Sequence, residues 1–293
     1  MGLPGFEPES REPESLRNAC FSQKSLNLGD FKDFCVVDLG LAESTAKRHV
    51  ERVEKLLEFV GDGKTSRIEI RSYLKSVKEG WSSSKYRNVL ASLVRFYRDY
   101  LGMKDVVDSF KFPSRSFKPI TVPSKDQLQR FYQGLKSDRD RALFLMYASS
   151  GLRRNEVIGL KLADVDFEKR MLMPKKEENK SKHVWLSFYN DETGKMLLKY
   201  LSSATKSDRL FDIANDHASR IFKNASKSTG IKVTPQVLRE WFCCEMANLG
   251  VQDRFVDAFC GRTPKSVLAR HYTDYSPERL KEIYDKAELN ILD

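Results

Sequence analysis

The stretch Ser149-Ser-Gly-Leu-Arg-Arg-Asn-Glu-Val-Ile-Gly-Leu160 is the most informative part of the sequence. It follows a strongly apolar run over residues 139–149, which predicts a buried helix. Gly151 is the residue type that most often ends a helix, and a second helix is expected directly after it. Arg153 lies at the turn between the two helices. We therefore expect its guanidinium to project from a rigid corner.

Two later stretches also combine arginine with helix signals. Thr234-Pro-Gln-Val-Leu-Arg-Glu-Trp-Phe242 places Gln236 and Arg239 three residues apart, and therefore on one face of a predicted helix. Gly261-Arg-Thr-Pro-Lys-Ser-Val-Leu-Ala-Arg-His-Tyr272 carries an arginine directly after a glycine and ends on a tyrosine. Taken singly, each stretch has an ordinary structural explanation: an arginine paired with Glu156, a polar helix face, and a tyrosine that covers apolar surface.

The order of these motifs resembles that of the tyrosine recombinases, the phage integrase family of site-specific recombinases. Gly-Leu-Arg-x-x-Glu at 151–156 is followed by a lysine-bearing hairpin, then by Leu-Arg at 238–239, Gly-Arg at 261–262 and finally Tyr272. The closing stretch is most similar to the archaeal virus and plasmid integrases. The resemblance covers residues 124–288 with specific motifs, whereas residues 20–112 match only by their position as the helical, DNA-clamping part.

The resemblance implies a role for each motif. Arg153 and Arg239 would clamp one phosphate, since a guanidinium binds phosphate through two parallel hydrogen bonds and stays charged at any working pH. Tyr272 would attack that phosphate and form a 3′-phosphotyrosine link, with Tyr275 as a rival nucleophile three residues later. Because the link conserves the energy of the phosphodiester bond, neither ATP, Mg²⁺ nor any other cofactor is expected.

A lysine in the hairpin would be the general acid for the leaving 5′-oxygen. The turn offers four lysines, and alignment by the following strand favours Lys182, with Lys180 as the alternative. The chain departs from the family pattern at Gln236, where a histidine is common, and at Arg262, where a histidine or tryptophan is common. Gln236 can hydrogen-bond a phosphate but cannot act as a base, whereas Arg262 adds a third cation. Glu156 is expected to orient an arginine through a salt bridge.

Composition and charge agree with a nucleic-acid partner. The 293 residues include 51 Lys and Arg against 41 Asp and Glu, a net charge of +10. No apolar run approaches the roughly 20 residues of a membrane-spanning helix. The 5 cysteines and 4 histidines show no zinc-site spacing, so no metal is expected. We expect a reduced, cytoplasmic protein with no membrane partner, in which Cys243 and Cys244 are core residues.

We expect a mainly α fold with a small β-hairpin or sheet, arranged as a two-domain clamp like that of the tyrosine recombinases. Residues 1–19, rich in Pro, Gly, Glu and Ser, predict a disordered leader with net charge −2. Residues 20–112 predict a helical DNA-binding domain, residues 113–123 a proline-containing linker, and residues 124–293 the catalytic domain. Positive charge is concentrated in the first domain's helices and in residues 109–136 and 169–182.

Hydrophobic periodicity and capping residues give the expected elements. In the first domain, helices are predicted at 44–60, with Ser44 as its cap, at 68–77, and from the serine run 82–84. Ser124 and Gln127 form a capping-box pattern. Two short strands are predicted at 171–174 and 183–188, and later helices at 192–201, 218–228, 236–249, 252–260 and 277–287.

The sequence thus predicts a site-specific recombinase that integrates or excises a mobile element. By the resemblance, a homotetramer would assemble on two double-stranded DNA sites, and helix 277–287 would dock on a neighbour or pack within its own chain. Gly5-Phe6-Glu7-Pro8 can be encoded by triplets that resemble a tRNA-gene arm, so the leader could be a translated attachment site. The alternatives are a non-catalytic basic DNA-binding protein, such as a decayed integrase or regulator, and a type IB topoisomerase-like relaxing enzyme.

Overall fold

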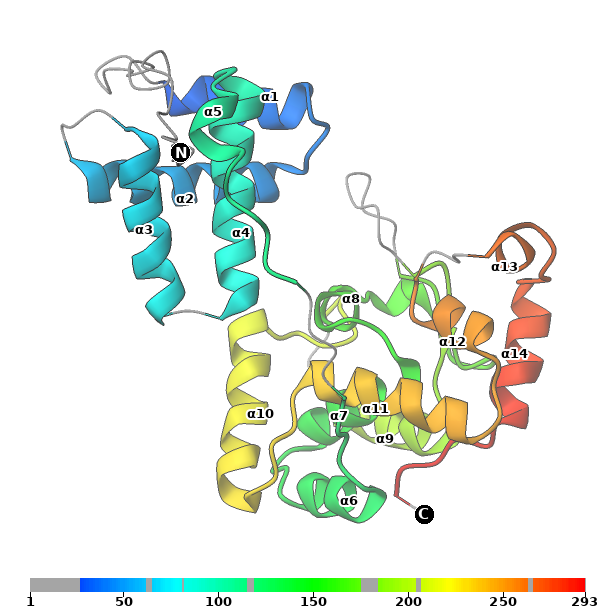
Figure 1. The fold of residues 1–293 in the computed structure, drawn as a ribbon. Coiled ribbons are helices and arrows are strands. Elements are labelled where there is room, and N and C mark those ends of the chain that lie inside the picture. The colour runs from blue at the N-terminus through cyan, green and yellow to red at the C-terminus, as the bar shows by residue number, and fades with distance from the viewer. Residues whose placement is uncertain are drawn as a thin grey trace, which may run out of the picture. The chain divides into compact units, whose positions relative to one another are not determined.

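The computed structural model describes residues 27–61, 65–80, 82–114, 119–174, 184–203, 207–262 and 266–292. It divides the chain into two compact units, Met1–Phe117 and Lys118–Asp293, referred to below as the N-terminal and the C-terminal unit (Figure 1). Both units are mainly helical, and the strands of the C-terminal unit form a three-stranded sheet. The expected fold class, mainly α with a small sheet, is confirmed. The leader 1–19 and part of the linker 113–123 lie outside the described residues.

The N-terminal unit consists of helices only, as far as it is described. Its elements are α1 (Leu28–Val37), α2 (Glu43–Val60), α3 (Arg67–Gly80), α4 (Ser83–Val94), the π-helix η3 (Arg95–Tyr100) and α5 (Lys104–Val107). The three predicted helices are α2, α3 and α4, and α4 begins in the predicted serine run, with Ser82 as its cap. The predicted cap of α2 is wrong, because Ala42 occupies that position and Ser44 lies inside the helix.

A buried polar pair lies in the core of the N-terminal unit. His49 on α2 is 5% exposed, and its Nδ1 lies 2.8 Å from the hydroxyl oxygen of Ser92 on α4. Two arginines of these helices, Arg52 and Arg87, are half-buried. Arg52 donates to Ser92, and Arg87 donates to the carbonyl of Pro113 at 2.6 Å. The basic surface of this unit is therefore smaller than the helical pattern suggests.

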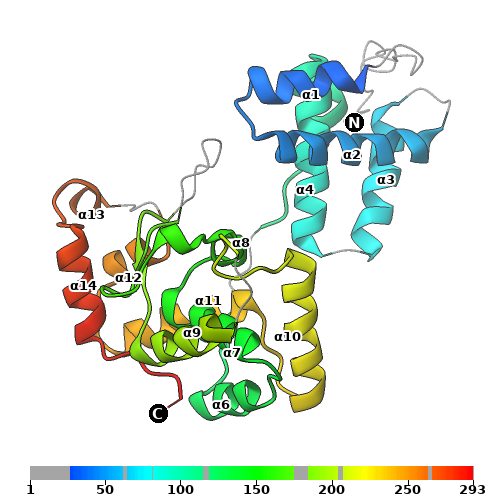
Figure 2. The same ribbon diagram turned by 180° about the vertical axis from the view of Figure 1, so that it is seen from behind.

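The C-terminal unit surrounds the buried helix α7, which spans Asp138–Ser150. Its other helical elements are α6 (Lys125–Gln133), α8 (Arg154–Gly159), η4 (Leu162–Asp164), α9 (Asp191–Ser203), α10 (Asn215–Thr229), α11 (Pro235–Asn248), α12 (Asp253–Phe259), α13 (Val267–His271) and α14 (Pro277–Lys286). The capping box predicted at Ser124 and Gln127 is present at the start of α6. Helices α9 and α11 pack against α7, as the view from behind also shows (Figure 2).

The sheet is small and antiparallel. Strand β1 (Val165–Asp166) pairs with β2 (Met171–Leu172), which pairs with β3 (Ser187–Phe188) so that Met171 faces Phe188. The two predicted hairpin strands are β2 and β3, both shorter than expected, and β1 was not predicted. The lysines of the connecting turn, including Lys180 and Lys182, lie outside the described residues.

Helix α14 packs within its own unit. The hydroxyl of Tyr284 donates to the carbonyl of Ser149 at 2.7 Å, and its ring lies near those of Phe188 and Phe259. Leu280 is buried beside it. Of the two positions expected for this helix, docking on a neighbour or packing in its own chain, the structure has the second.

Candidate active site

The corner after α7 requires a glycine. Gly151 ends the helix, as predicted, and its φ of +64° is the left-handed conformation that favours glycine. A Cβ atom at this position would lie 2.5 Å from the ring of Phe242. The chain therefore turns sharply against α11, and the carbonyl of Gly151 becomes an acceptor for a side chain of that helix.

Arg239 on α11 is that side chain. It is only 5% exposed, yet its Nη1 donates to the carbonyl of Gly151 at 2.5 Å and its Nη2 to the carbonyl of Cys260 at 2.7 Å. Burial lowers its pKa, but a guanidinium starts so far above neutrality that it remains charged. Two backbone acceptors thus hold a buried positive charge in one orientation.

Arg153 approaches the same corner from the start of α8. Its Nη1 lies 2.8 Å from Glu156 Oε1, the salt bridge expected from the sequence, and its backbone N–H donates to Glu156 Oε2. Its Nη2 donates to the carbonyl of Gly261 at 3.3 Å. The carbonyls that hold Arg153 and Arg239 therefore belong to consecutive residues, Cys260 and Gly261.

Arg262 is the residue directly after Gly261. Its Nη1 pairs with Asp257 at 3.0 Å, and its Nη2 donates to Cys243 Sγ at 3.4 Å. Burial lowers the pKa of Arg262, but the hydrogen bond to Asp257 and the neighbouring cysteines outweigh it, so that the pKa is raised overall. We call Arg153, Arg239 and Arg262 the arginine corner. Sequence reasoning missed both Asp257 and Cys243; the only signal was that Cys243 lies four residues after Arg239, on the same helical face.

Gln236 lies at the edge of this site. It is exposed on the first turn of α11, and its amide donates to Glu240 Oε1 at 2.9 Å. Arg239 follows three residues later on the same face, as the spacing predicts. The Gln236 amide is therefore bonded to a residue of its own helix, and among the described residues it makes no hydrogen bond to the arginine corner.

The two candidate nucleophiles differ in environment. Tyr272, the residue after α13, is 75% exposed, and the described residues give its hydroxyl no hydrogen-bond partner. Tyr275 is half-buried, with its hydroxyl donating to the carbonyl of Ala269 at 2.6 Å and its ring 6.2 Å from that of Phe255. Only the first of the two hydroxyls is available to a substrate without breaking an internal bond.

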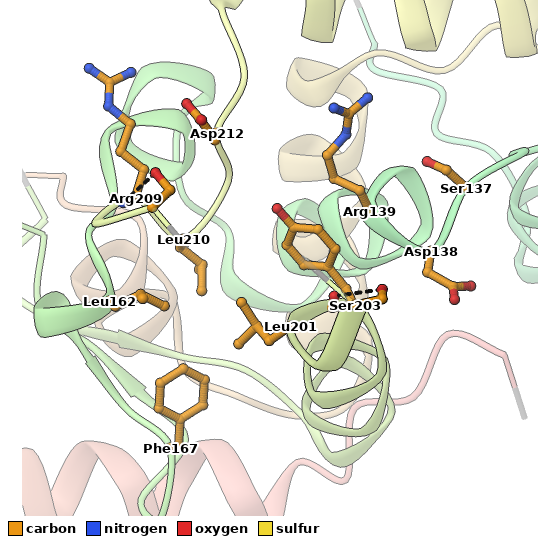
Figure 3. Close-up of a pocket in the computed structure, with 12 residues that line it drawn as sticks. Ser137, Asp138, Arg139, Leu162, Phe167, Leu201, Ser203, Arg209, Leu210 and Asp212 are labelled. Carbon is orange, nitrogen blue, oxygen red and sulfur yellow. Dashed lines mark hydrogen bonds between the residues drawn. The ribbon is translucent and has the colours of Figure 1, made fainter. Parts of the chain in front are cut away.

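The arginine corner does not coincide with a large cavity found elsewhere in this unit. That cavity, of about 860 Å³, lies among the starts of α7 and η4, the end of α9 and the segment around Arg209 (Figure 3). Its lining combines apolar side chains such as Phe167 with charged ones such as Arg139. None of the residues that line it belongs to the corner, so we assign the cavity no part in the chemistry.

The described residues contain no group of three or more His, Cys, Asp or Glu side chains placed to hold a metal ion. Within the same residues, no helix is both long and apolar enough to cross a membrane.

Comparison with known proteins identifies the family. The model of the phage integrase family matches residues 122–279, more than half of the chain. The chain belongs to the phage integrase family. Among its relatives, tyrosine recombinase XerA of Thermococcus onnurineus (strain NA1) is 26% identical over 263 residues, covering 85% of this chain and 91% of the relative. Tyrosine recombinase XerA of Saccharolobus solfataricus is 24% identical over 223 residues, or 72% of this chain and 76% of the relative.

Solved structures of this family share the fold. A lambda integrase dimer bound to a COC′ core site aligns with a TM-score of 0.68 at 14% identity, covering 91% of this chain and 82% of that one. The Tn1549 transposon integrase (residues 82–397) in complex with circular intermediate DNA aligns with a TM-score of 0.64 at 17% identity, covering 88% and 99%. The family match confirms the resemblance drawn from the motifs and the expected enzyme class, a tyrosine site-specific recombinase.

Proposed function

We propose that this integrase-family protein cleaves and rejoins duplex DNA at specific sites through a 3′-phosphotyrosine intermediate. The observation that carries the proposal is the arginine corner, where three guanidiniums from separate segments are held by backbone carbonyls and carboxylates. A phosphodiester presents two nonbridging oxygens, and its transition state adds negative charge to them. Each well-placed donor in such a site is worth about 10²–10³ in rate.

The remaining groups are assigned by chemistry. The exposed hydroxyl oxygen of Tyr272 attacks phosphorus, and the bond to the 5′-oxygen breaks. Lys182, or Lys180 as the alternative, gives the leaving oxygen its proton. Gln236 contributes a neutral hydrogen bond to the phosphate after releasing Glu240, and Arg262 supplies the third positive charge. A 5′-hydroxyl then attacks the phosphotyrosine and restores the DNA backbone, so that no cofactor is consumed.

The net charge of the chain and the relatives solved with DNA both support DNA as the partner. The lambda and Tn1549 integrases were solved with DNA, and a chain with a net charge of +10 is suited to the same polyanion. We propose that the N-terminal unit positions the phosphate backbone and that four copies assemble on two double-stranded DNA sites. The biological substrate would be a virus or plasmid whose attachment site resembles a tRNA gene and overlaps the codons of the leader 1–19.

Covalent capture tests the proposal. The full chain is incubated, with EDTA present, with a nicked suicide duplex made from the gene's own 5′ segment and with a pool of nicked duplexes of random sequence. We expect an SDS-resistant protein–DNA adduct, enriched for one sequence and unaffected by EDTA. Absence of any adduct at low and moderate salt would support the alternative of a non-catalytic DNA-binding protein.

Two further outcomes separate the remaining alternatives. A type IB topoisomerase-like enzyme would relax supercoiled DNA without preference for a site, whereas a recombinase exchanges strands between two copies of its site. A strict requirement for Mg²⁺ would contradict the mechanism, because arginine and lysine supply all the charge and the proton it needs. If the enriched sequence lacks a tRNA-like block, the link to the leader is wrong.

A further inference from the structure

Two thiols face each other beside the arginine corner. Sγ of Cys243, on α11, lies 3.4 Å from Sγ of Cys260, the residue that follows α12. Both are free cysteines, of which Cys260 is fully buried and Cys243 half-buried. The sulfurs of a disulfide are about 2.05 Å apart, so an approach of roughly 1.4 Å would join them. A movement of that size lies within the reach of the end of a short helix.

The two thiols differ in protonation. The hydrogen bond from Cys260 and the charges of Arg262 and Arg239 lower the pKa of Cys243. The same hydrogen bond and burial raise the pKa of Cys260. These shifts favour Cys243 as the thiolate and hydrogen-bond acceptor and Cys260 as the thiol and donor. A thiolate is the nucleophile in exchange reactions, so the pair combines an attacking sulfur with a resolving one.

We propose that Cys243 and Cys260 are an oxidation site that forms an intrachain disulfide and thereby lowers the activity of the neighbouring site reversibly. The oxidant is a low-molecular-weight disulfide. The Cys243 thiolate attacks one of its sulfurs, the S–S bond breaks, and one small thiolate leaves. The Cys260 thiol gives up its proton to that thiolate, attacks Cys243 Sγ and expels the second. Two protein thiols are oxidised, and one small disulfide is reduced to two thiols.

The disulfide would disturb the arginines through the backbone. The carbonyl of Cys260 holds Arg239 at 2.7 Å, and that of the next residue, Gly261, holds Arg153 at 3.3 Å. Drawing Cys260 toward α11 displaces both acceptors, and oxidation removes the thiolate that accepts from Arg262. Since a misplacement of about 1 Å at a reacting group costs on the order of 10²-fold, we expect a loss of adduct formation of that order. This effect rests on the proposed function, whereas formation of the disulfide does not.

Peptide mapping tests the disulfide itself. The full chain is equilibrated with mixtures of oxidised and reduced glutathione, alkylated and digested with trypsin without reduction. Cleavage after Arg239, Arg254 and Arg262 gives peptides 240–254 and 255–262, which we expect to be joined. Because Cys244 lies in the same peptide as Cys243, the matched control is Cys244→Ser, which should keep the link, whereas Cys243→Ser should lose it. Alkylation of both Cys243 and Cys260 after oxidation, or a link that survives Cys243→Ser, would overturn the proposal.

Adduct formation on the suicide duplex tests the consequence. We expect a loss of about 10²-fold in the oxidised chain that dithiothreitol reverses, and a ratio of oxidised to reduced activity near one in Cys243→Ser. A mapped disulfide without change in the adduct rate would overturn the effect on activity. A reduced chain that forms no adduct would instead refute the proposed function, while the peptide mapping still decides the disulfide.

Discussion

The two units bury a basic side chain in opposite ways. His49 in the N-terminal unit and Arg239 in the C-terminal unit are each only 5% exposed. His49 meets a serine hydroxyl, and burial together with the charges of Arg95 and Arg52 lowers its pKa to about 4, so that it is neutral at pH 7. Arg239 meets two backbone carbonyls and keeps its charge.

The two side chains differ in whether a charge is buried. Burying a charge is costly unless its hydrogen-bonding groups are satisfied, and a neutral group is the cheaper solution in a helical core. The N-terminal unit takes that solution and leaves charges such as Lys47 and Arg48 in water. The C-terminal unit keeps a buried positive charge, that of Arg239, at the arginine corner, where the proposed function places a phosphate.

The largest effect is expected at the nucleophile. Tyr272→Phe should abolish the covalent adduct, a loss of at least about 10³-fold, because the substitution removes the attacking oxygen. Tyr275→Phe is the matched control, since it removes only the hydroxyl that donates to the carbonyl of Ala269. It should retain the adduct with slightly lower stability. The opposite result in an SDS gel assay would move the nucleophile to Tyr275.

The second effect tests the buried charge itself. Arg239→Lys keeps the positive charge, but a lysine has no planar guanidinium whose two nitrogens can donate to the carbonyls of Gly151 and Cys260 at the same time. We expect adduct formation to fall about 10²–10³-fold and the C-terminal unit to lose on the order of 1–3 kcal/mol in urea unfolding. Arg262→Lys, at a half-exposed position, should cost much less in both measurements. Equal effects in the two variants would show that charge alone matters at the corner.

The third effect belongs to the N-terminal unit. The unfolded chain protonates His49 below about pH 6.5, the folded chain only below about pH 4. Stability of this unit should therefore increase as pH rises from 4 to 6.5, by on the order of 3 kcal/mol in all. Urea unfolding followed through the NMR amide signals of α2 measures this, and NMR titration of the imidazole should give a pKa near 4. His49→Gln should remove the pH dependence, and its persistence would refute the role of His49.

The sequence predicted the residues of the arginine corner and the Arg153–Glu156 salt bridge, but not the other groups that hold these arginines. Gly151 placed Arg153 at a turn and helical spacing placed Arg239 on the face of Gln236, because these signals are local in the chain. The role of the two arginines was implied by the resemblance to the tyrosine recombinases. The carbonyls of Cys260 and Gly261 and the thiol pair come from distant segments that only packing brings together.

Strand β1 escaped prediction for a similar reason: two residues carry no periodicity, and they are a strand only because Leu172 and Met171 pair with them. The burial of His49 was not predicted, because a histidine does not count toward an apolar stripe, yet it is buried on α2 together with Ala46, Val53 and Leu56.

The smallest effect concerns the surface charges that the N-terminal unit leaves in water. Arg48 on α2 is exposed, whereas Arg98 pairs with Asp99 at 2.8 Å. If α2 lies along the phosphate backbone, Arg48→Gln removes one phosphate contact and should lower the slope of log affinity against log salt by about 0.9, a change of a few fold in affinity at moderate salt. Arg98→Gln should leave the slope unchanged, since its charge is already neutralised. Fluorescence anisotropy with one short duplex at several salt concentrations measures both variants. If the slope changes equally in both variants, the N-terminal unit acts on DNA through its total charge and not through a phosphate contact of Arg48. Its arginines would then differ fully from those of the C-terminal unit, which are held in fixed positions.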